Sequence, residues 1–77
     1  MNLFDTSKKI HFIGIGGIGM SGMAEFLFNH GFDISGSDIS SSERTKYLSS
    51  IGIKISSSHQ KSNIKNHDLV VYSSAVD

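Results

Sequence analysis

Cysteine, proline and tryptophan are all absent from this 77-residue sequence. Without cysteine the chain has no disulfide, no thiolate nucleophile and no cysteine-ligated zinc site, which is compatible with a reducing compartment. No apolar run approaches the roughly 18 residues that a membrane-spanning helix needs, and the polar segment 1–9 lacks the apolar core of a signal peptide. We therefore expect a soluble, cytoplasmic protein with no membrane partner.

An excess of one charge is also missing, since seven Lys and Arg balance seven Asp and Glu. A neutral chain whose only adjacent basic pair is Lys8-Lys9 lacks the electropositive field that nucleic-acid binding requires. The four histidines have no metal-site spacing, so we expect no metal. So short a chain holds one small core and one site, which predicts a single domain and excludes a complete multidomain enzyme.

The sequence does contain alternating strand and helix patterns. Short apolar, β-branched runs predict strands at 10–15, 32–37, 53–56 and 68–73. Helical spacing predicts a helix over 18–30, ended by Gly31, with an apolar face of Met20, Met23, Ala24, Leu27 and Phe28. This alternation predicts an α/β domain, a Rossmann-like open parallel sheet with helices on both faces.

A second helix is expected over 41–50, ending at Gly52. Ser40 stands three residues before Glu43, the spacing of a capping box. The apolar contacts of this helix are predicted to be Tyr47, Leu48 and Ile51. The polar residues 60–65 are interpreted as a short helical turn.

A glycine cluster lies between the first predicted strand and helix. The run Gly14-Ile15-Gly16-Gly17-Ile18-Gly19 matches G-x-G-x-x-G in the strand-to-helix context that makes the pattern informative. Glycines allow close approach of the backbone to a ligand, and the first N–H groups of a helix favour an anion such as a diphosphate. A second match at 17–22 overlaps the first, so the pattern leaves open which amides face the ligand. Gly22 is interpreted as a position of close helix packing on the first strand.

Polar residues end the second strand, at the edge where open parallel sheets bind ligands. Asp38 follows Gly19 at close to the roughly 20-residue offset at which a carboxylate reaches a ribose hydroxyl. The alternative role of Asp38 is an Asx-type cap of the following turn. Ser37 shares both interpretations.

Other candidates for the same edge carry weaker signals. His59 follows the third strand and either faces the crevice or is solvated, whereas His11 is interpreted as a packing residue. Ser73 and Ser74 end the fourth strand, where they either bind phosphate or sugar or simply lead into a loop. Met20 belongs either to the core or to the rim of the site.

Three segments of the chain together resemble one protein family. They are His11-Phe12-Ile13-Gly14-Ile15-Gly16-Gly17-Ile18-Gly19-Met20-Ser21-Gly22-Met23-Ala24-Glu25, then Gly36-Ser37-Asp38, then Tyr72-Ser73-Ser74-Ala75-Val76. Their order and spacing are similar to the amino-terminal domain of the Mur ligase family. The long glycine and methionine segment is far more specific than an isolated G-x-G-x-x-G.

The resemblance implies that residues 1–77 are a fragment of a three-domain cytoplasmic enzyme of peptidoglycan synthesis. This first domain would hold the UDP moiety of UDP-N-acetylmuramate, while ATP, magnesium and L-alanine bind in the other domains, where an ATP-dependent ligation follows. The resemblance assigns Gly16, Gly17, Ile18, Gly19 and Met20 to the diphosphate, Ser37, Asp38, Ile39 and His59 to the uridine, and Ser73, Ser74 and Ala75 to the sugar-phosphate path.

No residue of the chain is expected to be catalytic. The G-x-x-x-x-G-K-[ST] loop that cradles ATP phosphates is absent, and no Gly-Lys pair occurs. The chain alone is therefore expected to bind no cofactor and to be inactive.

Three alternatives remain open from the sequence. The first is the NAD(P)-binding half of a dehydrogenase, which the glycine pattern and Asp38 favour but which lacks a second mononucleotide unit. The second is the ligase that recycles murein tripeptide, which shares the fold but departs from the Gly-Gly-Ile-Gly-Met-Ser run. The third is a small nucleotide sensor without catalysis.

Overall fold

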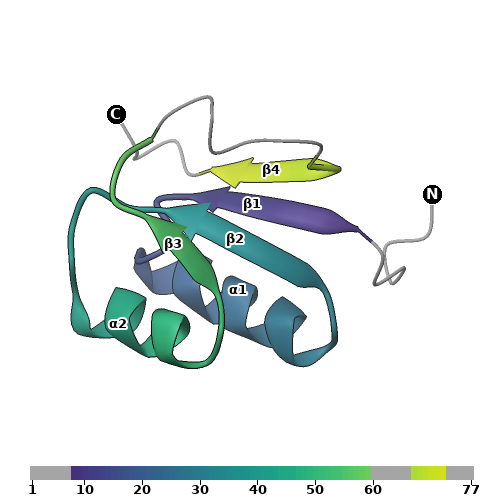
Figure 1. The fold of residues 1–77 in the computed structure, drawn as a ribbon, viewed down its shortest axis with the longest axis horizontal. Helices are drawn as coiled ribbons and strands as arrows, with labels where there is room; N and C mark the ends of the chain where they lie inside the picture. Colours follow the sequence, from purple (N-terminus) through teal and green to yellow (C-terminus); the bar gives the residue numbers. More distant parts are fainter. Residues whose placement is uncertain (1–7, 60–66, 73–77) are drawn as a thin grey trace.

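The structure, a computed structural model, describes residues 8–59 and 67–72. Its elements in chain order are β1 (Lys9–Ile13), α1 (Ile18–Asn29), β2 (Asp33–Ser37), α2 (Glu43–Ser50), β3 (Lys54–Ser56) and β4 (Leu69–Tyr72). The strands of this described part pair in parallel in the order β3-β2-β1-β4 (Figure 1). This order is the first part of the doubly wound order, and it confirms the predicted α/β, Rossmann-like class.

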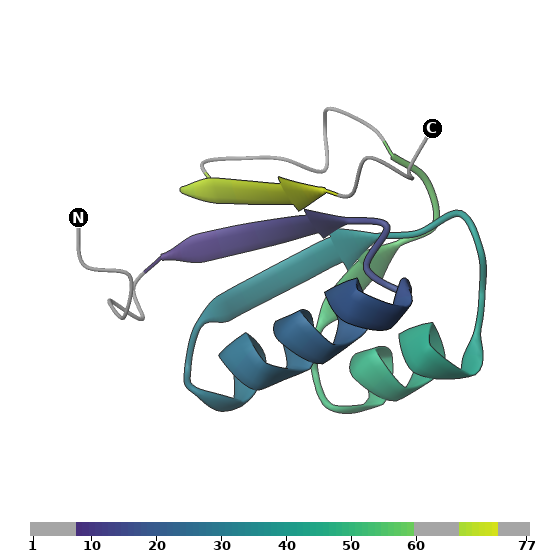
Figure 2. The same ribbon diagram turned by 180° about the vertical axis from the view of Figure 1, so that it is seen from behind.

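Both described helices cover the same face of the sheet (Figure 2), so the predicted arrangement with helices on both faces is not seen among the described residues. The chain steps in one direction from β1 to β2 to β3, and crossovers of one hand then place their helices on one side. From β3 to β4 the direction reverses. That connection includes residues 60–66, so the predicted helical turn at 60–65 lies outside the described residues.

The apolar core lies between the sheet and this helical layer. Alternate side chains of β1 and β2 point toward the helices. From the helices, Ala24 of α1 and Leu48 of α2 complete the core. The buried apolar residues are Ile10, Phe12, Ile15, Ala24, Phe32, Ile34, Leu48 and Ile53. Met20, Leu27, Phe28 and Ile51 pack against this set.

Two predicted core residues lie outside it. Met23 is 49% exposed. Ala24 occupies the position over the sheet, and Met23, one residue earlier, points about 100° away around the helix. Tyr47 is 42% exposed, since Leu48 fills the core position on α2. The Tyr47 hydroxyl instead donates to Glu25 on α1.

The capping box predicted from Ser40 and Glu43 is also wrong. Ser42, not Ser40, is the N-cap: the Thr45 N–H donates to Ser42 Oγ at 3.2 Å, and the Ser42 N–H donates to Thr45 Oγ1 at 2.8 Å. The Ser40 N–H donates to Asp38 instead, in an Asx turn. The helix ends agree with the prediction, because Gly31 and Gly52 have φ values of 92° and 115°, in the region that favours glycine.

The glycine loop is anchored on β2. The N–H groups of Gly14 and Ile15 both donate to the Ser37 carbonyl, at 2.8 and 3.0 Å. Ile15 is fully buried over Gly36, where an added Cβ would lie 2.8 Å from the Ile15 Cβ. The absence of a side chain at Gly36 thus leaves room for Ile15, and the buried Ile15 side chain holds the loop against β2.

The sheet face opposite the helices carries a cluster of polar side chains. His11 is buried, as predicted, with its Nδ1 2.9 Å from Ser35 Oγ, and the same Oγ lies 3.0 Å from His67 Nε2. The rings of His11 and His67 meet edge to face at 5.2 Å. Burial lowers the pKa of His11, and the charges of His67 and His59 lower it further. His11 is therefore neutral at neutral pH in the folded chain.

We expect Gly36→Ala to lower the free energy of unfolding by about 1–3 kcal/mol, because the methyl group would overlap Ile15 in a packed core. Gly22→Ala is the matched control. A Cβ at Gly22 meets nothing within 4 Å, so this glycine is not the close-packing position that the sequence suggested. Alanine there should stabilise α1 by about 0.5–1 kcal/mol. Urea unfolding measures both variants, and equal stabilities would contradict the packing role of Gly36.

Acid should destabilise the fold through His11. The unfolded chain takes up a proton at this histidine near its usual pKa of about 6.5, whereas the folded chain resists protonation. The unfolded state then binds more protons, so the free energy of unfolding falls as pH drops below about 6.5. His11→Asn, which keeps a hydrogen-bonding group, should flatten this dependence in urea unfolding at a series of pH values. An unchanged pH slope in the variant would overturn the assignment to His11.

Candidate functional site

The candidate site lies at the carboxyl edge of the sheet. β1 leads there into the glycine loop, and β2 leads into the loop at 38–42. The strand order reverses between β1 and β4, and such a switch point is where open α/β sheets bind ligands. The fold thus brings the glycine loop and the end of β2 to one edge.

The earlier amides of the glycine loop are used within the protein. Besides the two that donate to Ser37, the Gly16 N–H donates to Asp38 Oδ2 at 2.8 Å and the Gly17 N–H to the Gly14 carbonyl at 3.0 Å. An added Cβ at Gly16 would lie 2.7 Å from Asp38 Oδ2 and 2.8 Å from Thr45 Cγ2. Gly16 therefore permits the close approach of Asp38 and α2 to the loop.

Within residues 8–59 and 67–72, the next three amides of the loop have no hydrogen-bond acceptor. Ile18, Gly19 and Met20 open α1, and among the described residues their N–H groups have no backbone or side-chain acceptor. Unpaired amides at the positive end of a helix dipole form an anion site. A Cβ at Gly19 meets nothing within 4 Å, so open space lies in front of the helix start. The overlapping glycine patterns left open which amides face the ligand. The hydrogen-bond pattern favours the amides of 18–20.

Asp38 ties the two loops of the site together. Its Oδ2 accepts from Gly16, and its Oδ1 accepts from the Ser40 N–H at 2.9 Å. The second contact is the Asx turn that the sequence offered as the alternative role. A carboxylate accepts up to about four hydrogen bonds, so both oxygens keep capacity for a ligand hydroxyl. The ribose contact of Asp38 stays a prediction.

A pocket of about 380 Å³ lies beside Asp38. Residues of the 38–41 loop, α2 and the end of β3 line it: Asp38, Ile39, Ser40, Ser41, Thr45, Lys46, Ser49, Ile55, Ser56 and Ser57. Its wall therefore combines hydroxyl groups, one ammonium group and two isoleucines. Ile39 is 75% exposed at its mouth, which leaves an apolar surface on which a planar ring can rest.

Ser37 and His59 lie together near this pocket. Ser37 is fully buried, and its Oγ lies 2.6 Å from His59 Nδ1. The serine hydroxyl is thus used to orient the histidine, which is half-buried. Ligand contacts by these two residues stay predictions, and Ser73, Ser74 and Ala75 lie outside the described residues.

A larger cavity of about 680 Å³ lies elsewhere. It is lined by Lys9, Asp33 and Lys54, the first residues of their strands, and thus reaches the opposite edge of the sheet. None of the predicted ligand residues is among its lining residues.

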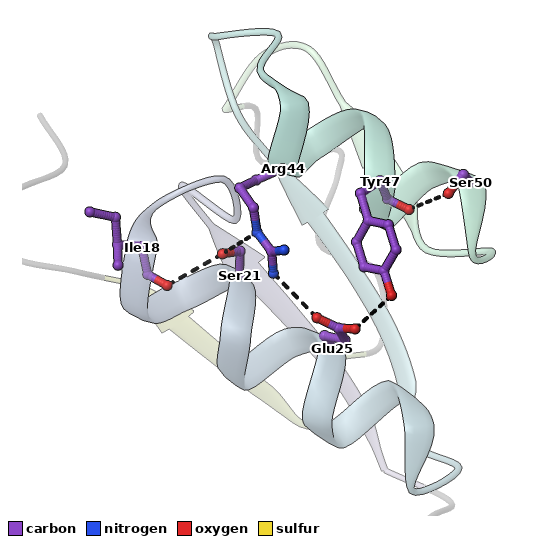
Figure 3. A network of polar contacts seen from close by, with 6 residues as sticks. All are labelled: Ile18, Ser21, Glu25, Arg44, Tyr47 and Ser50. Carbon is purple, nitrogen blue, oxygen red and sulfur yellow. Dashed lines mark hydrogen bonds and ion pairs between the residues drawn. The ribbon is translucent and has the colours of Figure 1, made fainter.

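The sequence gives no signal for a polar network that joins α1 to α2 (Figure 3). Arg44 on α2 donates through Nη2 to Glu25 Oε1 and through Nε to Ser21 Oγ, both at 3.2 Å. The Tyr47 hydroxyl donates to Glu25 Oε2 at 2.7 Å, and Ser21 Oγ donates to the Ile18 carbonyl at 3.3 Å. These partners are far apart in sequence, so no local pattern indicates the pairing.

Over residues 8–59 and 67–72, no cluster of acidic residues and histidines is arranged to hold a metal ion. No helix in the same part of the chain is both long and apolar enough to span a membrane.

Comparison with known proteins identifies relatives of the chain. The UDP-N-acetylmuramate–L-alanine ligase of Clostridium novyi (strain NT) is 54% identical over 96% of this chain, and that of Acetivibrio thermocellus is 61% identical over 90%. A crystal structure of UDP-N-acetylmuramate-alanine ligase from Thermotoga maritima matches with a TM-score of 0.84, at 49% identity over 90% of this chain. The chain spans about 16% of the length of these proteins.

The family match covers almost the whole sequence. Residues 9–77 match the family described as "Mur ligase family, catalytic domain". The relatives at 54% and 61% identity carry names from the same family, and the solved structure has the same fold. The chain belongs to the Mur ligase family.

Proposed function

We propose that this chain binds the UDP moiety of UDP-N-acetylmuramate as the amino-terminal domain of a longer ligase. The observation that carries the proposal is the set of N–H groups at 18–20, which open α1 at the switch point of the sheet and have no acceptor in the described part of the chain. A diphosphate supplies the negative charge that such a helix start favours. The names of the relatives, UDP-N-acetylmuramate–L-alanine ligases, support the choice of substrate.

The uridine is proposed to occupy the pocket beside Asp38. Its ring would rest on Ile39, and a ribose hydroxyl would donate to the Asp38 carboxylate. Because Asp38 also holds Gly16, the carboxylate sets the distance between the sugar and the diphosphate amides. The chain's own residues therefore bind and orient the substrate.

The rest of the activity is proposed for the longer protein. L-Alanine ligation in peptidoglycan synthesis needs ATP and magnesium to activate the muramyl carboxylate, and we place both, with L-alanine, beyond this chain. The missing G-x-x-x-x-G-K-[ST] loop supports that division. The need for ATP also supports a cytoplasmic location, with a role in building the cell wall and thus in cell shape and division.

Gly19→Val should abolish UDP binding while the fold is retained. The branched side chain would enter the open space in front of the free amides, where the diphosphate is proposed to lie. Gly22→Val is the matched control, because a Cβ there also meets nothing but lies one turn further along α1. Isothermal titration with UDP-N-acetylmuramate, UDP and NADH measures the affinities. Equal UDP affinity in both variants, or a preference of the wild type for NADH, would overturn the proposal.

Asp38→Ala should weaken UDP binding more than binding of inorganic diphosphate. The variant loses the proposed ribose contact, worth about 1–3 kcal/mol for a hydrogen bond to a charged group, while the amides at 18–20 stay in place. Part of the loss will come from the released loop, since Asp38 also binds Gly16 and Ser40. Ser40→Pro removes the Ser40 donor but keeps the carboxylate and its contact with Gly16, and so measures the contribution of the Ser40 contact to that part. Equal losses for UDP and diphosphate would leave Asp38 with only its structural role.

A further inference from the structure

α2 is held to the core by very little apolar surface. It spans Glu43–Ser50, and Leu48 is its one buried apolar residue; the other buried residue, Thr45, is polar. Apart from Leu48 only Ile51, the residue that caps the helix end, packs against the core, so apolar packing alone defines the rotation of this short helix weakly. Another interaction must therefore set that rotation.

The polar network of Figure 3 is placed to do so. Arg44 and Tyr47 stand three residues apart, hence on one side of α2, and both reach the carboxylate of Glu25 on α1. The Arg44 guanidinium also lies 5.4 Å from the Tyr47 ring centre. Two donors from one helix meeting the two oxygens of one carboxylate resist rotation in either direction.

The network also has a fixed base on α1. Ser21, which accepts from Arg44, is buried and donates to the carbonyl of Ile18 in the first turn. The carboxyl pKa of Glu25 is lowered by the Tyr47 hydroxyl, and further by Arg44, so Glu25 stays ionised at neutral pH. The network thus fixes the position of α2 relative to the first turn of α1, where the amides of 18–20 lie.

The rotation of α2 matters because other residues of this helix line the nucleoside pocket. Thr45, Lys46 and Ser49 form that wall, and Thr45 also packs against Gly16. We propose that the network of Arg44, Glu25 and Tyr47 is a positioning element of the nucleotide site, which sets the pocket wall relative to the diphosphate amides. This inference rests on the proposed UDP-binding function and adds residues that touch no part of the ligand.

The test compares two ligands on the 77-residue chain. Arg44→Met keeps the length of the side chain and removes its charge, and Tyr47→Phe removes only the hydroxyl. Each should weaken UDP binding, by up to about fivefold for Arg44→Met, on the scale of an exposed ion pair. Binding of inorganic diphosphate should change by less than about twofold, because the amides at 18–20 belong to α1. Glu43→Gln is the matched control: it removes a carboxylate from α2, and among the described residues Glu43 makes no side-chain hydrogen bond.

Three results would overturn the inference. Unchanged UDP affinity in Arg44→Met and Tyr47→Phe would show that the network does not position the pocket. An equal loss for UDP and diphosphate in Arg44→Met would make Arg44 a direct phosphate ligand. An equal loss in Glu43→Gln would assign the effect to general charge. Failure of the wild-type chain to bind UDP would instead count against the proposed function.

A ligand-free measurement tests the network independently of UDP. Tyr47→Phe and Arg44→Met should accelerate amide hydrogen exchange at Gly16 and Ser40, whose N–H groups bind Asp38 beside α2. Amides of the paired strands β1 and β2 should keep their wild-type rates. Uniform acceleration across the sheet would mean that the variants only lower global stability, and no acceleration at Gly16 and Ser40 would contradict the positioning role.

Discussion

The site depends on how tightly the glycine loop sits on β2. Ile15 fills the space over Gly36, and the Ser37 carbonyl takes two amides of the loop. This contact turns the chain sharply after β1, and α1 then begins with its free amides at the sheet edge. The apolar core beneath the loop therefore determines where the anion site lies. Ile15 thus contributes to ligand binding only indirectly: it packs in the core and holds the loop, and it contacts no ligand in the proposed function.

Asp38 shows how one carboxylate serves structure and site together. It draws Gly16 toward the end of β2 and closes the turn that precedes α2. Gly16 has no Cβ, so α2 can approach the loop through Thr45. The pocket beside Asp38 consequently has walls from three segments of the chain: the 38–41 loop, α2 and the end of β3.

The sequence predicted features that have a local cause. Strand runs, the helix-ending glycines and the G-x-G-x-x-G loop all follow from neighbouring residues, and the structure contains them. The sequence could not predict features that arise from residues far apart in the chain. The cap of α2 is Ser42, whose amide and hydroxyl pair with Thr45; Tyr47 donates its hydroxyl to Glu25 outside the core, and Gly22 faces open space. The choice of free amides likewise needed the contacts of Ser37 and Asp38, which no pattern of glycines contains.

The histidine and serine chain on the far face of the sheet has a consequence for proton positions. Ser35 Oγ carries one proton but lies within hydrogen-bond distance of both His11 and His67. If the serine donates to one ring, it must accept from the other, so one ring nitrogen bears hydrogen where its counterpart has a lone pair. In that arrangement the tautomers of the two histidines are linked: reversing either one requires the hydroxyl to rotate and the other ring to exchange its proton as well.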